Sequence, residues 1–140
     1  MGVRDERTVD LAIEVTATPD EVWEAIATGP GISRWFVPTD IEGDAIHLHH
    51  PNGLEQTGTI TARERPHRFR FEFPEYAPTP EAEPERTALE IVVEAQAGGT
   101  CVIRLVNSGF GSGADWDRQL ELSQSGWERC LAALQDLLTR

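Results

Sequence analysis

The sequence predicts an α+β fold, in which a curved antiparallel sheet of six to seven strands packs on one long C-terminal helix and two short helices follow the first strand. The main observation is an apolar stripe within residues 115–140. Its members recur at steps of three and four, so they share one helical face: Trp116, Leu120, Ser123, Trp127, Leu131, Leu134 and Leu138. Ahead of this helix, alternating segments joined by turn residues indicate consecutive β-hairpins, which supply a surface for the stripe.

The chain opens with a strand and a capped helix. Apolar and polar residues alternate over 9–15, which predicts a strand buried on one face. Thr18 is placed to cap the next helix, Pro19 suits its first position, and Glu21 supplies the third residue of a capping box. Residues 28–31, Thr-Gly-Pro-Gly, are expected to end this helix. One further helical turn is expected over 32–36.

The middle of the chain predicts hairpins. Strands are expected over residues 45–50, 56–65, 67–73, 87–95 and 100–107. Asn52-Gly53 and Gly98-Gly99 provide tight-turn signals between them. Residues 74–85 hold four prolines and four glutamates and are expected to form a mobile acidic loop. Asp115 or Ser112 is expected to cap the long helix.

Two small residues lie in or beside the apolar stripe of the long helix, where large apolar residues would be expected. Ser123 lies inside the apolar stripe, and Gly126 lies on its flank, where it costs about 1 kcal/mol relative to alanine. One interpretation is close approach of the helix backbone to the sheet. The other is a cavity between helix and sheet, floored by Trp116 and Trp127, that receives an apolar ligand. Both interpretations stay open at the level of the sequence.

Length and composition exclude several classes of protein. With 140 residues, the chain is expected to form a single domain, residues 1–140. No apolar run approaches the roughly 20 residues that span a bilayer, and the N-terminus lacks a signal-peptide core, so a cytoplasmic location without membrane insertion is expected. The net charge of −12 argues against a nucleic-acid partner, which requires a basic patch. Cys101 and Cys130 are expected to be free buried thiols.

The sequence shows no catalytic or metal-binding signature. There is no G-x-S-x-G motif and no phosphate-binding loop that leads into a helix, so no catalytic residue and no cofactor are predicted. His47 and His49 alternate with Ile46 and Leu48, which directs the two imidazoles to solvent, and no metal site is predicted. His50, at the end of that strand, is the histidine expected to face a cavity.

Five short stretches carry a family resemblance along the whole chain. They are Ala-Thr-Pro-Asp-Glu-Val-Trp at 17–23, Ile-Ser-Arg-Trp-Phe at 32–36, Gly-Gly-Thr at 98–100 with Val102 and Arg104 after it, Ser-Gly-Phe at 108–110, and Gly-Trp at 126–127. Together they resemble the activator of heat-shock protein 90 ATPase homologue family, part of the START/Bet v 1-like (SRPBCC) superfamily. The resemblance implies a helix-grip fold with a hydrophobic cavity between the long helix and the sheet.

The resemblance implies several functions and no shared catalytic set. Relatives include lipid and hormone carriers, polyketide cyclases and aromatases, antibiotic-sequestering proteins, and the co-chaperone domain that names the family. The eukaryotic co-chaperone carries an additional N-terminal domain that this sequence lacks, so the family name is not expected to describe its function.

Three functional hypotheses follow. The first is a protein that binds a hydrophobic or aromatic small molecule; its expected contacts are Trp35, His50, Phe71, Trp116, Leu120, Ser123 and Trp127. The second is an enzyme of the cyclase or hydrolase type that uses the same cavity, for which an inward-facing ionisable group is required. The third is an interaction module, either a co-chaperone or a homodimer, in which Leu122 lies off the stripe and is free to contact a partner.

Overall fold

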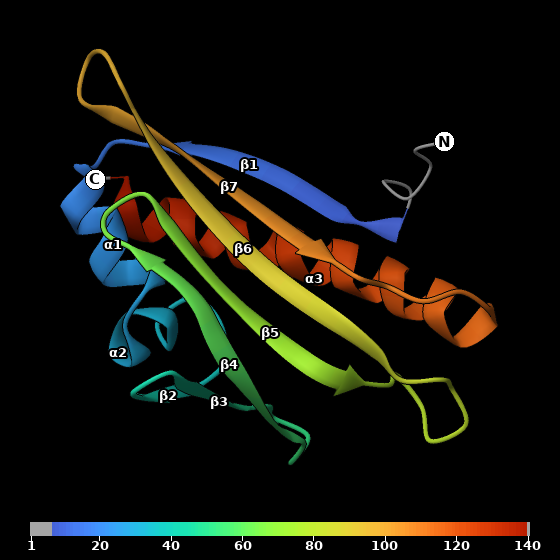
Figure 1. The fold of residues 1–140 in the computed structure, drawn as a ribbon. Helices are drawn as coiled ribbons and strands as arrows, with labels where there is room; N and C mark the ends of the chain where they lie inside the picture. The colour runs from blue at the N-terminus through green and yellow to red at the C-terminus, as the bar shows by residue number, and fades with distance from the viewer. Residues whose placement is uncertain (1–6, 140) are drawn as a thin grey trace.

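The computed structural model describes residues 7–139, which form a seven-stranded antiparallel sheet with three helices on one of its faces (Figure 1). The strands are β1 (Val9–Val15), β2 (Thr39–Glu42), β3 (Ala45–His49), β4 (Glu55–Glu64), β5 (Arg68–Tyr76), β6 (Glu85–Gln96) and β7 (Thr100–Ser108). The helices are α1 (Pro19–Ile26), α2 (Gly29–Ile32) and α3 (Ala114–Leu138). The predicted α+β helix-grip architecture is confirmed.

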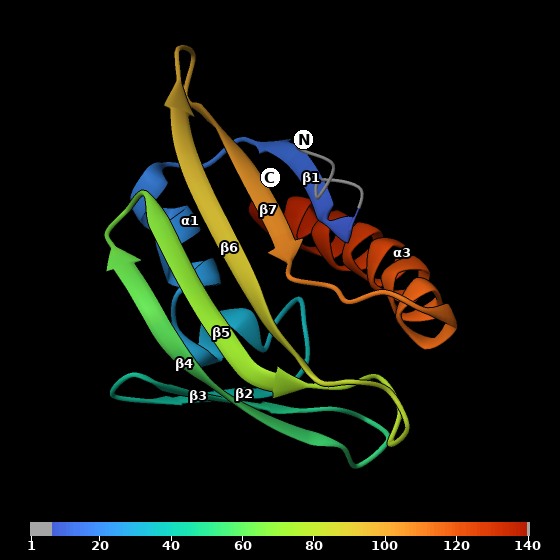
Figure 2. The ribbon, with the colours of Figure 1, turned by 45° about the vertical axis from the view of Figure 1, so that its right-hand side comes forward.

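The sheet order is β1-β7-β6-β5-β4-β3-β2, so every neighbouring pair except β1–β7 is a hairpin between consecutive strands. β1 joins the far edge by pairing with β7, from Val9 opposite Asn107 to Val15 opposite Cys101. Figure 2 shows β2 and β3 running at a steep angle to β6 and β7. This strong twist lets one sheet surround a single helix.

The start of the chain follows the predicted capping chemistry, with one correction. Thr18 Oγ1 accepts from the Glu21 amide at 3.2 Å, and Glu21 Oε1 accepts from the Thr18 amide at 2.8 Å, which completes the capping box of α1. The second helix, however, begins at Gly29 and ends at Ile32, with Thr28 as its N-cap. The two helices meet so closely that a Cβ at Gly31 would lie 1.9 Å from the Glu24 carbonyl oxygen, which requires glycine there.

β2 is the strand that the sequence pattern did not reveal. It pairs with β3, placing Asp40 opposite His47, and the turn between them contains Gly43 at φ +60°. Its four residues are too few to show a period, and two of them are acidic. A short, charged strand is the usual form of a sheet edge.

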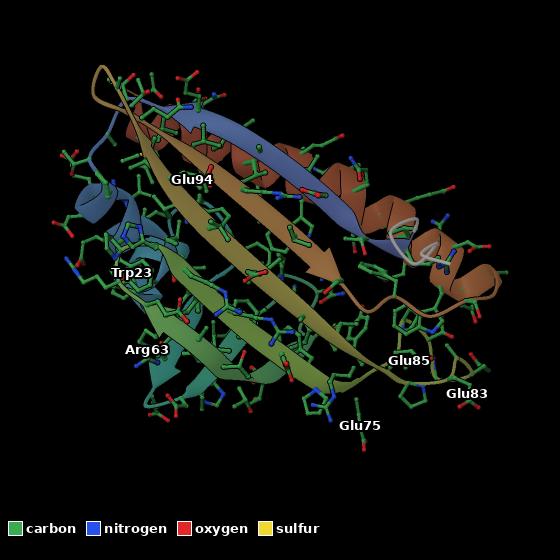
Figure 3. All side chains as sticks on the ribbon, turned by 45° about the horizontal axis from the view of Figure 1, so that its top comes forward. Trp23, Arg63, Glu75, Glu83, Glu85 and Glu94 are labelled. Atoms are coloured by element: carbon green, nitrogen blue, oxygen red, sulfur yellow. The ribbon has the colours of Figure 1, made fainter. Side chains whose placement is uncertain are left out.

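Both ends of the acidic segment belong to strands. β5 continues to Tyr76 and β6 begins at Glu85, so the connecting loop is shorter than expected. Trp116 Nε1 donates to the Glu83 carbonyl oxygen at 3.0 Å, which fastens the loop to the first turns of α3. Figure 3 shows Glu75, Glu83 and Glu85 together at this end of the sheet.

The start of α3 corrects another expectation. Gly113 occupies the N-cap position at φ +103°, and no side chain caps the helix there. Asp115 lies inside the first turn instead, and its carboxylate accepts from Thr79 Oγ1 at 2.9 Å. The helix therefore begins with a link to the acidic loop in place of the expected cap by Asp115 or Ser112.

Two apolar clusters hold the fold together. The larger lies between the sheet, α1 and the C-terminal half of α3, and contains Trp23, Phe69 and Leu134 among its buried members. The smaller consists of Val9, Phe110 and Trp116. Cys101 and Cys130 are both free thiols. Among the described helices, none combines the length and the apolar character needed to cross a bilayer.

Candidate functional site

A cavity of about 460 Å³ lies between α3 and the sheet, within the size range of small-molecule sites. Four parts of the chain line it. The segment after α2 contributes Trp35, Phe36 and Val37; the β3–β4 region contributes Leu48, His50 and Gln56; β5, β6, β7 and the segment after β7 contribute Phe71, Phe73, Tyr76, Thr87, Leu89, Asn107 and Phe110; α3 contributes Gln119, Leu122, Ser123, Gly126, Trp127, Arg129 and Cys130.

Aromatic rings form two walls of this cavity. On one side, Phe36 packs against Trp127 with ring centroids 4.7 Å apart and planes tilted by 37°. On the sheet side, Phe71 meets Phe73 edge to face at 5.6 Å. Aromatic surfaces offer a large apolar area with little side-chain freedom to lose, so these walls suit a flat apolar ligand.

The polar lining groups are already held in place by one another. His50 Nε2 lies 2.6 Å from Gln56 Oε1, and Trp127 Nε1 donates to Asn107 Oδ1 at 3.0 Å. The Asn107 amide group also donates to the Ala88 carbonyl oxygen at 2.9 Å, so both ends of its side chain are engaged. These bonds set the orientation of Trp127 and His50 before any ligand arrives.

The ionisable lining groups are few. Burial raises the pKa of the Tyr76 hydroxyl and of the Cys130 thiol, which keeps both groups neutral at pH 7. Among the described residues that line the cavity there is no aspartate or glutamate. Because an amide oxygen only accepts, His50 carries a proton on Nε2, and its Nδ1 is the basic atom when the ring is neutral.

Five of the seven expected ligand contacts line this cavity: Trp35, His50, Phe71, Ser123 and Trp127. Trp116 and Leu120 do not. Trp116 is 2% exposed and packs edge to face with Tyr76 and Phe110, each at 5.9 Å, while Leu120 packs on the same smaller cluster. Tyr76, Phe110 and the acidic loop enclose Trp116, so of the two tryptophans expected in the floor of the cavity it is Trp127 that lines it.

The structure distinguishes between the two interpretations of Gly126. A Cβ added there would meet one atom within 4 Å outside the helix backbone, Arg129 Nη2 at 3.9 Å. No described backbone atom of the sheet lies within 4 Å of that Cβ position. Gly126 and Ser123 both line the cavity, so the small residues of α3 leave open space there.

Several lining residues were not among the expected contacts. Phe36, Gln56, Asn107 and Arg129 come from four different parts of the chain, and no periodicity links them. Leu122, 51% exposed, lies off the apolar stripe and yet lines the cavity. A partial signal was available for Phe36, which directly follows the expected contact Trp35.

His47 and His49 lie away from this cavity. Ile46 and Leu48 between them are buried, as the alternation predicts. His49 stands between Asp40, with Nε2 3.0 Å from Oδ2, and Glu55, with Nδ1 3.3 Å from Oε2; hydrogen bonds to these carboxylates raise the pKa of the imidazole. Within residues 7–139, no three His, Cys, Asp or Glu side chains gather as they would to hold a metal ion.

Solved structures share this fold at low sequence identity. MLL2253 from Mesorhizobium loti has a TM-score of 0.80 at 20% identity, with 94% of this chain and 96% of that chain covered. The Aha1 dimer from Colwellia psychrerythraea has a TM-score of 0.72 at 17% identity, with coverage of 94% and 95%. DynU16, from the dynemicin biosynthetic locus, has a TM-score of 0.75 at 18% identity, with 94% of this chain and 47% of DynU16 covered.

Sequence comparison assigns the family. No curated protein matches the chain. The sequence model for the family described as "Activator of Hsp90 ATPase homolog 1-like protein" matches residues 16–139, from the end of β1 through the whole of α3. That match includes all the lining residues of the cavity, and the fold agrees with it. The chain therefore belongs to the Activator of Hsp90 ATPase homolog 1-like protein family.

Proposed function

We propose that this protein binds an apolar, ring-containing small molecule in the cavity between α3 and the sheet. The observation that carries the proposal is the pair of aromatic walls, Phe36–Trp127 and Phe71–Phe73, around about 460 Å³ of space. Burial of apolar ligand surface contributes roughly 25 cal/mol per Å², and aromatic contacts add to it. The polar lining groups then orient the ligand.

The structural relatives support a small-molecule role. DynU16 lies in a biosynthetic locus, and the products of such loci are small molecules. The ligand is proposed to be a flat or polycyclic compound because the two walls present ring faces and edges.

A cytoplasmic location of the protein stays a prediction.

The test is a titration of the protein with a panel of aromatic polyketides, sterols and fatty acids, followed by intrinsic tryptophan fluorescence. Trp35 and Trp127 line the cavity and report on its filling. At least one compound is expected to give a saturable change. The matched variants are Ser123→Phe, which fills the cavity, and Ser125→Phe, which adds the same group at an exposed position of α3.

The fold of both variants is checked by circular dichroism. Ser123→Phe is expected to weaken binding at least tenfold, because the added ring takes the place of the ligand, and Ser125→Phe is expected to bind like the wild type. Equal binding by the two variants, or no saturable change across the panel with a folded protein, would contradict the proposal.

A cyclase- or hydrolase-type enzyme is the second candidate, and His50 is the observation that favours it. The imidazole lines the cavity with its proton directed to Gln56, which leaves Nδ1 as a base. Mass spectrometry of a bound compound after incubation distinguishes the two functions. A carrier returns the compound unchanged, whereas an enzyme converts it and loses that activity in His50→Gln.

A protein partner is the third candidate. The Aha1 from Colwellia psychrerythraea was solved as a dimer, and Leu54 and Leu122 are exposed large apolar side chains here. Light scattering after size exclusion tests a homodimer, and co-elution with an Hsp90 chaperone tests the co-chaperone hypothesis. A monomeric protein that does not co-elute with the chaperone would exclude both the homodimer and the co-chaperone hypotheses.

A further inference from the structure

The cavity differs in charge from the rest of the molecule. The chain carries 24 aspartates and glutamates against 12 arginines, and its net charge is −12. Among the described residues that line the cavity, however, there is no acid and there is one arginine, Arg129. The lining is thus locally basic in an acidic protein.

Arg129 also stands out among the arginines. The structure describes ten of them, and ion pairs engage seven: Arg7, Arg63, Arg65, Arg68, Arg70, Arg86 and Arg104. Among residues 7–139, three arginines form no ion pair with a carboxylate: Arg34, Arg118 and Arg129. Of these three, Arg129 lines the cavity. In a chain with twice as many acids as bases, an unpaired guanidinium at a cavity is available for a ligand.

The position of the guanidinium agrees with this role. Arg129 Nη2 lies 3.9 Å from the place where a Cβ at Gly126 would stand, so the side chain folds back along α3 over the glycine. Gly126 and Trp127, in the preceding turn, line the same cavity. The guanidinium therefore lies over Gly126, in the part of the cavity lining that α3 contributes.

Building on the proposed function, we propose that the ligand is an apolar ring-containing acid whose carboxylate pairs with Arg129. A guanidinium matches the two oxygens of a carboxylate with two parallel hydrogen bonds, and the rings occupy the aromatic walls. The field of the whole molecule repels anions, so a preference for the acid has to come from this local contact. Arg129 is exposed and solvent screens the pair, so the expected preference is modest, roughly three- to tenfold.

The test uses three probes of nearly equal shape: 2-naphthoate, 2-naphthamide and 2-(aminomethyl)naphthalene in its ammonium form. Dissociation constants are measured by ligand-observed NMR at pH 7.5 and low salt. The wild type is expected to bind naphthoate three- to tenfold more tightly than naphthamide, and added salt is expected to reduce this ratio. Arg129→Gln is expected to bring the ratio close to one.

Arg118→Gln is the matched control, because it removes the same charge from the same helix at an exposed residue outside the cavity lining. It is expected to keep the naphthoate preference. Three outcomes would overturn the proposed acid ligand while the cavity still binds aromatics. The ammonium probe binds most tightly, the wild type binds acid and amide equally, or the two variants lose the preference equally. If none of the three probes binds and a neutral panel compound does, the acid proposal is wrong and the proposed function stands. Failure of the probes and of the whole panel would contradict both.

Discussion

At the scale of single residues, small side chains in this protein serve two opposite purposes. Gly111 is needed for space, because a Cβ there would lie 2.8 Å from Trp116 Nε1 and 2.9 Å from Glu85 Cγ. Gly126 faces open space, with Arg129 Nη2 at 3.9 Å as its nearest neighbour. Both look alike in the sequence. Their surroundings determine that one is a packing requirement and the other is part of the cavity.

Gly126→Ala is expected to stabilise the protein by about 0.5–1 kcal/mol. Alanine loses less backbone entropy than glycine in a helix, and its methyl group fits at an ordinary contact distance here. Urea denaturation followed by circular dichroism measures the free energy of unfolding.

The contrasting variant is Gly111→Ala. Trp116 is 2% exposed and bonded to Glu83, so its indole has little room to move away from a new methyl group. This variant is expected to lose about 1–3 kcal/mol through overpacking. A gain of stability in Gly111→Ala, or a loss in Gly126→Ala, would show that the described surroundings of the two glycines are wrong.

At the scale of elements, local chemistry determines where α1 begins. Thr18 and Glu21 bond reciprocally to each other's backbone amide, and Pro19 occupies the first turn. α3, by contrast, starts at Gly113 without a side-chain cap and is attached to the acidic loop through Trp116. Capping rules therefore locate the short helix well and the long one less well, because contacts from a distant segment take the place of the cap.

Thr18→Ala is expected to destabilise the protein by about 1 kcal/mol, because the Glu21 amide loses its acceptor. Thr18→Ser keeps a hydroxyl and is expected to retain most of the stability. Thermal unfolding monitored by circular dichroism provides the measurement. Thr16→Ala, at an exposed position two residues earlier, is the control, and an equal loss there would contradict a specific role of the cap.

At the scale of the whole molecule, ion pairs on the sheet engage several of the acidic side chains. Arg104 on β7 holds both carboxylate oxygens of Asp10 on β1, at 2.9 and 2.6 Å. On the neighbouring strands, Glu72 bonds to Arg70 and Arg86. In both cases hydrogen bonds from arginine hold the pKa of the carboxyl below its usual range.

Asp10→Asn is expected to cost about 0.2–1 kcal/mol at pH 7, since the ion pair is largely exposed. The pKa of Asp10 is lower in the folded protein than in the unfolded chain, where it is about 3.9. The ionised carboxylate therefore stabilises the folded state above the unfolded-state pKa, and this stabilisation is lost as the pH falls through the lower folded-state pKa. The destabilisation by Asp10→Asn is therefore expected to decrease as the pH falls below the unfolded-state pKa, measured as free energies of unfolding between pH 7 and 3.

The matched control is Glu14→Gln on the same strand, which changes the net charge equally without removing an ion pair. Any relief of the general repulsion at a net charge of −12 is the same in both variants. If both showed the same pH dependence, the Asp10–Arg104 pair would not be its source.

The sequence by itself determined the type and order of the main elements. The period of residues 9–15, the capping box at Thr18, the turns at Asn52-Gly53 and Gly98-Gly99 and the stripe of α3 are local patterns, and local patterns depend only on neighbouring residues. Five residues that the sequence analysis named as ligand contacts also come together in the cavity: Trp35, His50, Phe71, Ser123 and Trp127.

Only the tertiary structure decided what surrounds the space beside Ser123 and Gly126. Trp116 faces the same side of α3 as Trp127, yet the acidic loop and Phe110 cover it and remove it from the cavity. Asn107 and Gln56 enter the lining through strand register, and Arg129 through the direction in which its side chain folds. Contacts between residues distant in sequence carry no periodic signal, so the chemistry of the cavity is visible only once the sheet has closed around the helix.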